Sequence, residues 1–267
     1  MKKIVLALTA IAALTGSASA ADMGRPYTKA PAPVAVAPSW TGFYIFGGGG
    51  GGVWDANGGV QNTFTGNCII CTNTRTGGDG WFGTVGAGYD WQYTPSWVFG
   101  VFADGMFGSL KGNIGDAGVF AGGPSSGIVG NEKMRDAWAV GARLGYLVAP
   151  NVLSYVNGGY TATYWSGTTL LGSASGLPSG LHTNSFNRGG GFVGAGVENN
   201  LNIFGITAPG WFMKTEYRAA YLNNKNLSEL VDGTNAPFGR DISFKPFVQT
   251  ISTSLVYRFN WGGPVRY

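Results

Sequence analysis

The segment at residues 211–221, WFMKTEYRAAY, alternates between two kinds of side chain. Successive side chains of a β-strand point to opposite faces, so Lys214, Glu216 and Arg218 share one face. The other face is apolar or aromatic apart from Thr215. Three charges would exclude the first face from lipid, whereas the second fits it. The pattern predicts a membrane strand with its polar face turned inward and its apolar face turned outward.

The composition favours the same class of protein. Charged residues make up 11% of the 267 residues, against about 25% in ordinary soluble domains. Beyond residue 20, no stretch reaches the roughly 18 uninterrupted apolar residues that a membrane helix requires. A closed β-barrel is the other structure that satisfies all of its backbone groups in lipid, and we expect one here.

The N-terminal region predicts export. Residues 1–20 have the form of a secretory signal peptide, in which Lys2 and Lys3 precede an apolar run and Ala18 and Ala20 form the cleavage site. The Ala/Pro-rich residues 21–39 that follow are expected to form a periplasmic tail. Together with the barrel pattern, these features predict the outer membrane of a Gram-negative cell.

Eight segments have strand character. They are expected near residues 42–54, 79–92, 97–110, 134–148, 152–165, 187–199, 211–222 and 245–259. Short turns alternate with long polar connections at 55–78, 111–133, 166–186 and 223–244. This layout predicts an all-β fold: an eight-stranded antiparallel up-and-down transmembrane barrel over residues 40–262, with short periplasmic turns and four long extracellular loops. Both termini are expected in the periplasm, with residues 263–267 as a C-terminal extension.

The alternation places seven charged side chains on inward faces. They are Asp104, Arg143, Glu198, Lys214, Glu216, Arg218 and Arg258. The interior of an eight-stranded barrel is just wide enough to be filled by its own side chains. We therefore expect a mutually neutralising polar core, although a narrow gated ion path would use the same residues.

Tryptophans and glycines carry two further expectations. Nine tryptophans lie toward segment ends, as in the two aromatic girdles of a membrane barrel: Trp40, Trp54, Trp81, Trp91, Trp97, Trp138, Trp165, Trp211 and Trp261. The six glycines at Gly47–Gly52 satisfy a dinucleotide-binding pattern, but no helix follows them. They continue the alternation of Tyr44 and Phe46, and we expect them to be strand and to bind no nucleotide.

The remaining motifs predict no catalysis. Cys68 and Cys71 are the only cysteines of an exported chain, so a local loop disulfide is expected. His182 is the only histidine, which excludes a two-histidine metal site and leaves a catalytic triad one possible base. No metal, cofactor or catalytic residue is expected. Nucleic acid is not an expected partner, because no Lys/Arg-rich run is present.

Four stretches carry a family resemblance: SWTGFYIFGGGGGG, VFGVFAD, MKTEYRAAYL and SLVYRFNWG. In these stretches the chain resembles the small outer-membrane β-barrel family of rhizobia and their relatives, often called outer-membrane immunogenic or porin-opacity-type proteins. The resemblance implies an eight-stranded barrel with a surface-exposed role. It also implies insertion by the outer-membrane barrel-assembly machinery, which would read Leu255, Tyr257 and Phe259 in the last strand. Some family members are expected to bind haemin.

These features predict a structural and surface component of the outer membrane, not an enzyme. Its surroundings would be outer-membrane lipid and lipopolysaccharide, and its loops would meet host or surface ligands. One alternative is a narrow porin-like channel for small solutes. A second alternative is a haemin-binding surface protein that uses His182.

Overall fold

The computed structural model describes residues 39–116, 127–203 and 206–259. The chain divides into two units, Met1–Val36 and Ala37–Tyr267, and every described residue belongs to the second. The expected signal peptide, residues 21–38 of the expected tail and the expected C-terminal extension lie outside the described residues. The described part of the chain contains no helix that is long and apolar enough to cross a membrane.

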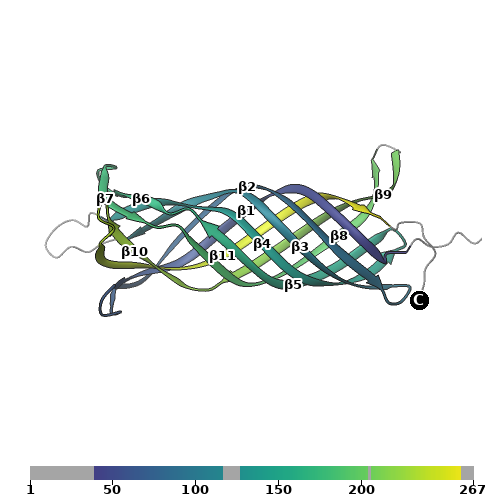
Figure 1. The fold of residues 1–267 in the computed structure, drawn as a ribbon, viewed down its shortest axis with the longest axis horizontal. Coiled ribbons are helices and arrows are strands. Elements are labelled where there is room, and N and C mark those ends of the chain that lie inside the picture. The colour runs from purple at the N-terminus through teal and green to yellow at the C-terminus, as the bar shows by residue number, and fades with distance from the viewer. Residues whose placement is uncertain (1–38, 117–126, 204–205, 260–267) are drawn as a thin grey trace, which may run out of the picture. The chain divides into compact units, whose positions relative to one another are not determined.

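The described residues form strands joined by short connections (Figure 1). The strands are β1 (Gly42–Asn62), β2 (Cys68–Gln92), β3 (Trp97–Asp116), β4 (Ile128–Ala149), β5 (Val152–Trp165), β6 (Thr168–Gly172), β7 (Pro178–Thr183), β8 (Phe186–Ile203), β9 (Ile206–Leu222), β10 (Lys225–Val231) and β11 (Pro237–Arg258). Eight of them pair in the order β1-β2-β3-β4-β5-β8-β9-β11, and β11 pairs back with β1. All of these pairings are antiparallel, so the sheet closes on itself as the expected eight-stranded barrel.

Strands β6, β7 and β10 extend the barrel at one end, which we call the hairpin end. β6 follows β5 after residues 166–167, β7 leads into β8 through residues 184–185, and β10 follows β9 after residues 223–224. At this end β4 pairs with β6, β6 with β7, β7 with β10, and β10 with β11. A ring of eight strands therefore continues past the three interruptions, and Figure 1 shows β6, β7 and β10 gathered at that end. The opposite end, which carries the connections 93–96 and 150–151, is called the turn end.

The expected long loops are therefore largely strand. β1 continues to Asn62 and β4 begins at Ile128, well inside segments that we expected to be loop. The reason is that these extensions bury their own apolar side chains, including Leu170, Leu181 and Leu227, while their outer face mixes polar residues with a few apolar ones. Outside lipid this outer face need not be apolar, so the segments look like loops in the sequence.

Side chains alternate between a buried inner face and an exposed outer face. Tyr155 and Val156, which the sequence left unassigned, are 3% and 59% exposed, so Tyr155 points inward. The tryptophans divide in the same way. Five are exposed on the outer face, as expected of girdles: Trp81, Trp91, Trp97, Trp138 and Trp211.

The girdle expectation is wrong for three tryptophans. Trp40, Trp54 and Trp165 are buried in the barrel interior. Trp54 has the same parity on β1 as the inward Tyr44, so its side chain must follow that residue inside. Trp261 lies outside the described residues.

The six glycines are strand, within β1. They belong to two classes. A Cβ atom on Gly48 or Gly50 would coincide with the backbone carbonyl of Thr253 or Ile251 on β11. A Cβ on Gly47 would lie 3.8 Å from its nearest neighbour, an ordinary contact. The close approach of β1 and β11 therefore requires glycine at the inward positions of the run.

Candidate functional site

The candidate site is the barrel interior, where the alternation places charged side chains from several strands. All seven charged residues that we expected to face inward do so, and Asp90 on β2 joins them. Four are basic and four are acidic: Arg143, Lys214, Arg218 and Arg258, with Asp90, Asp104, Glu198 and Glu216. The set is therefore formally neutral, and the acid that completes the balance is the one absent from the expected group.

The layer nearest the turn end is a closed ring of ion pairs. Arg143 donates from Nε to Asp90 Oδ1 at 2.9 Å and from Nη1 to Glu198 Oε2 at 3.0 Å. Arg258 donates from Nε to Glu198 Oε1 at 2.8 Å, and its Nη2 lies 2.8 Å from Asp90 Oδ2. The four residues come from β2, β4, β8 and β11, which are alternate strands of the barrel. Each charge thus contacts two of opposite sign and links non-adjacent strands.

Aromatic rings enclose this layer. The Arg143 guanidinium lies 4.4 Å from the ring centre of Tyr44, and Arg258 lies 4.4 Å from that of Trp40. Trp40 also donates from Nε1 to the Pro150 carbonyl at 3.2 Å, so it lies across the mouth at the turn end. Arginine side chains desolvated against ring faces gain cation–π attraction, which adds to the ion pairs.

The second layer crosses the barrel. Arg218 on β9 donates to both carboxylate oxygens of Asp104 on β3, at 3.1 and 2.8 Å. These strands are four places apart in the ring of eight, so the bidentate pair spans the interior. Arg218 also donates to Glu216 Oε1 at 2.7 Å, and the Tyr155 hydroxyl donates to Glu216 Oε2 at 2.8 Å.

Beside this layer lies an internal cavity of about 40 Å³. Its lining includes Lys214, Thr84, Thr161 and Ser252. The Lys214 ammonium is 3.8 Å from Glu216 Oε2 and 3.4 Å from the ring centre of Phe46. Polar and apolar side chains line the cavity together, and it has room for about three water molecules, at roughly 10–15 Å³ each. Such waters would complete the hydrogen bonds of Lys214.

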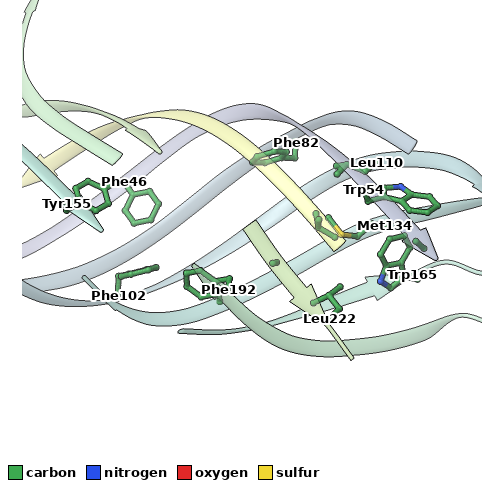
Figure 2. Close-up of a cluster of buried hydrophobic side chains, with 14 of the residues drawn as sticks. Phe46, Trp54, Phe82, Phe102, Leu110, Met134, Tyr155, Trp165, Phe192 and Leu222 are labelled. Atoms are coloured by element: carbon green, nitrogen blue, oxygen red, sulfur yellow. The ribbon is translucent and has the colours of Figure 1, made fainter. Parts of the chain in front are cut away.

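An aromatic cluster closes the interior toward the hairpin end (Figure 2). Trp54 on β1 and Trp165 on β5 meet edge to face with ring centres 5.3 Å apart, although their strands lie on opposite sides of the ring. Phe244 contacts both, at 5.6 and 5.0 Å, and Phe186 stacks on Trp165 at 6.0 Å. Edge-to-face pairs of this kind are stabilising beyond the area that they bury, and here they join opposite sides of the ring.

Among the described residues, the interior therefore combines two charged layers with an apolar plug. The four carboxylates of these layers are held by arginines, so none of the four is placed as a general base beside a nucleophile. Within the described ranges, no group of three or more His, Cys, Asp or Glu side chains could hold a metal ion. The sequence missed Tyr44 and Tyr155 as members of the site, because tyrosine is equally common on the outer face of a membrane strand.

Residues singled out elsewhere lie away from this interior. His182 on β7 contacts Asp232 through Nδ1 at 2.7 Å, and haemin binding there stays a prediction. Cys68, at the start of β2, is disulfide-bonded, while the side chain of Cys71 lies outside the described residues. Leu255 and Phe259 are exposed on the outer face, and Tyr257 shares their parity. Recognition of these last residues by the assembly machinery stays a prediction.

Two curated proteins are similar to the chain over nearly its whole length. They are the 31 kDa outer-membrane immunogenic proteins of Brucella melitensis and Brucella suis, each 30% identical over 269 residues, which cover 97% of this chain and all of the relative. The crystal structure of the outer membrane protein OprG from Pseudomonas aeruginosa matches with a TM-score of 0.51 and 11% identity, over 82% of this chain and 97% of OprG. At that identity the match supports the fold alone. No protein-family model matches the chain.

Proposed function

The chain belongs to the family of the 31 kDa outer-membrane immunogenic proteins, and from that premise we propose that its barrel is a closed, non-conducting anchor for a rigid surface structure. The protein is a structural and surface component of the outer membrane. The proposal concerns what its interior does. In the outer membrane the hairpin end is extracellular and the turn end is periplasmic.

One observation carries the proposal: the cross-section is filled at successive levels by residues from opposite strands. The pair of Arg218 and Asp104 spans the interior, and Trp54 and Trp165 meet across it nearer the hairpin end. A solute could pass only if both contacts separated. Breaking a buried charge pair costs about 3–5 kcal/mol, which opposes frequent opening.

The competing function is a narrow channel, and the internal cavity is the feature that favours it. The cavity joins Lys214 and Glu216, which an ion path would use. Its volume of about 40 Å³ accommodates a few waters rather than a hydrated solute. It also lies between a charged layer and the aromatic plug, and so supports a hydration site better than a pathway.

The hairpin end supports a display role. Hydrogen bonds hold its turns against neighbouring strands. On the β1–β2 turn, Thr63 donates its backbone N–H to the Gly239 carbonyl at 3.1 Å and its hydroxyl to Asp241 at 2.8 Å. Both Brucella relatives carry the word immunogenic in their names. We infer that the fixed hairpin turns are the antigenic surface of this chain as well, and that it has no catalytic activity.

A liposome-swelling assay tests the closed interior. Purified, folded protein reconstituted into liposomes should give no faster swelling in small sugars or amino acids than protein-free liposomes. A general porin reconstituted at equal density serves as the positive control. Swelling that rises with the amount of folded protein would establish a solute path and remove the proposal.

A further inference from the structure

Basic residues on the outer face of the barrel are confined to one side of the membrane. Five side chains make up this set within the described strands: Arg75, Lys111, Lys133, Arg135 and Lys245. All five lie toward the hairpin end of their strands, and the described residues of the turn end carry no outward Lys or Arg. The outward acids Asp55, Asp79 and Asp136 lie toward the same end, so it is the local arrangement of the basic residues, and not their side of the membrane alone, that indicates a partner.

Two of these lysines lie directly opposite each other. Lys111 on β3 and Lys133 on β4 are register partners. Their Cβ atoms are therefore about 4.5–5.5 Å apart, a spacing at which like charges repel. Arg135 follows on β4 at a bulge next to the same strand pair. No one of the three forms an ion pair within 4.0 Å in the part of the chain that the structure describes.

Two acids flank the cluster but form no ion pair with it. Asp79 is the register partner of Lys111 on β2, and Asp136 follows Arg135. Neither carboxylate comes within 4.0 Å of a basic nitrogen of the described residues. Three neighbouring cations thus lie on the outer face without an ion-pair partner of their own among the residues that the structure describes.

The height of the cluster identifies the anion. Trp81 on β2 pairs with Ser109, and Lys111 is two residues further toward the hairpin end, about 7 Å along the strand. Exposed tryptophans such as Trp81 and Trp138 mark the membrane–water interface. Lys111 and Lys133 therefore lie at the level of the headgroups of the outer leaflet.

We propose that Lys111, Lys133 and Arg135 form a binding site for a phosphate group on the lipid A headgroup of lipopolysaccharide. The phosphate lies between the two lysines, accepts charge-assisted hydrogen bonds from both and from the guanidinium, and removes the repulsion between them. The site holds one lipid against the β3–β4 wall. It depends on the outer-membrane location and is independent of whether the interior conducts.

The test measures binding of detergent-dispersed lipid A to the folded full-length protein by calorimetry. Bisphosphorylated lipid A is compared with dephosphorylated lipid A of the same acyl composition, both in EDTA, which removes divalent cations that could bridge phosphate to Asp79 or Asp136. The variant is Lys111→Gln/Lys133→Gln. Its control is Arg75→Gln/Lys245→Gln, which changes the net charge equally at outward basic residues outside the cluster. A heat-modifiability gel verifies that each variant is folded.

The proposal predicts that the wild type and the control bind the phosphorylated lipid at least about tenfold more tightly than the dephosphorylated one. The Lys111→Gln/Lys133→Gln protein should lose that preference and keep its weak affinity for the dephosphorylated lipid. Equal binding of the two lipids by the wild type overturns the site. An equal loss in the control pair overturns it too, because diffuse surface charge would then explain the binding.

Discussion

At the residue scale, the interior charges act as pairs and not as independent groups. Asp90 is fully buried, and both Arg143 and Arg258 contact it. Burying a charge is expensive, and only the surrounding opposite charges and ring faces offset that expense. Removal of one member therefore leaves its partners buried with unbalanced charge.

Asp90→Asn tests this dependence. The substitution preserves shape but removes one of two negative charges from the ring, so the free energy of unfolding should fall by about 3–5 kcal/mol. Asp55→Asn is the matched control, because Asp55 is partly exposed and its contact with Arg75 is 4.0 Å long. It should cost less than about 0.5 kcal/mol. Denaturant titration in phospholipid vesicles, followed by tryptophan fluorescence, measures the free energy of unfolding of both variants. Equal losses would mean that the buried ion-pair ring stabilises the barrel no more than an exposed contact does.

Glu132 provides a pH-dependent test outside the membrane-spanning part of the barrel. It lies on β4 six residues from Trp138 toward the hairpin end, is 0% exposed, and accepts one hydrogen bond from the Gly167 backbone N–H at 3.1 Å. Burial raises the pKa of Glu132 from 4.5 to about 7. The folded state therefore holds this proton more tightly than the unfolded state does, and the stability that it contributes is lost as pH rises from about 4.5 to 7.

The expected loss is about 3 kcal/mol over that window. Glu132→Gln keeps the hydrogen-bond acceptor and cannot ionise, so the variant should lack this part of the decline. The free energy of unfolding is measured from pH 4.5 to 8 for both proteins. Parallel curves would show that a different group titrates.

The sequence identifies some members of the interior and not others, for reasons visible at single residues. The alternation of side chains is enough to place Lys214, Glu216 and Arg218 inside the barrel, because a charged face cannot contact lipid. It fails at Tyr155 and Val156, since both suit lipid and parity alone does not choose between them. It also cannot pair Arg218 with Asp104, because contacts across the interior depend on how the strands are staggered around the closed barrel.

At the element scale, β1 requires glycine at some positions of its glycine run and not at others. The inward Gly48 and Gly50 allow the β11 backbone to approach, whereas a side chain at the outward Gly47 would make only an ordinary contact. Elsewhere an inward glycine makes room for a ring, as Gly88 does for the Tyr44 side chain. Gly48 and Gly50 are therefore a close-packing seam between the first and last strands, where the barrel closes.

Gly50→Ala and Gly47→Ala separate the two classes. The first places a methyl group on the Ile251 carbonyl and should prevent closure of the barrel, or destabilise it by several kcal/mol. The second should be neutral or slightly stabilising, because alanine restricts the unfolded chain. Heat-modifiability gels report the closed fraction after refolding. Similar behaviour of the two variants would contradict the seam.

The hairpin formed by β6 and β7 should behave as barrel and not as loop. Thr168, Thr169 and Leu170 pair with residues of β7, and the Leu170 side chain is buried. Amide hydrogen exchange should therefore be slow through 168–172 and 179–183 and fast at Ala174 and Ser175 at the tip of the turn. Uniformly fast exchange across 166–185 would restore the flexible loop that the polar sequence suggests.

The strand ends illustrate which boundaries a sequence can fix. At the turn end β8 and β9 run past their expected limits of 199 and 211 to Ile203 and Ile206. The other two connections are where we expected them: β5 spans 152–165, and β2 and β3 meet the turn at Gln92 and Trp97. Tight turns there contain proline, and the outer face is apolar up to the turn. At the hairpin end the outer face meets water, so the difference in polarity between the two faces disappears. The strands there extend up to 11 residues beyond their expected limits, as at the start of β2.

At the scale of the whole molecule, the barrel is closed twice, by the pairing of β1 with β11 around its wall and by side chains across its interior. The wall can be predicted from alternation and the signal-like N-terminus. The filling could only be expected from strand number, because contacts such as that of Trp54 with Trp165 join residues more than 100 positions apart. The eight charges of the two layers balance one another, as the cost of burying an unpaired charge requires.

Single-channel recording in planar lipid bilayers tests the closed interior most directly, because it detects ions as well as larger solutes. Folded wild-type protein should give no current steps above those of the bilayer alone. Trp54→Ala/Trp165→Ala/Arg218→Ala, which removes the plug and the crossing ion pair, serves as the opened reference if it still folds. Reproducible wild-type steps that change on substitution of Arg143 or Glu216 would contradict the account and identify the interior as an ion path.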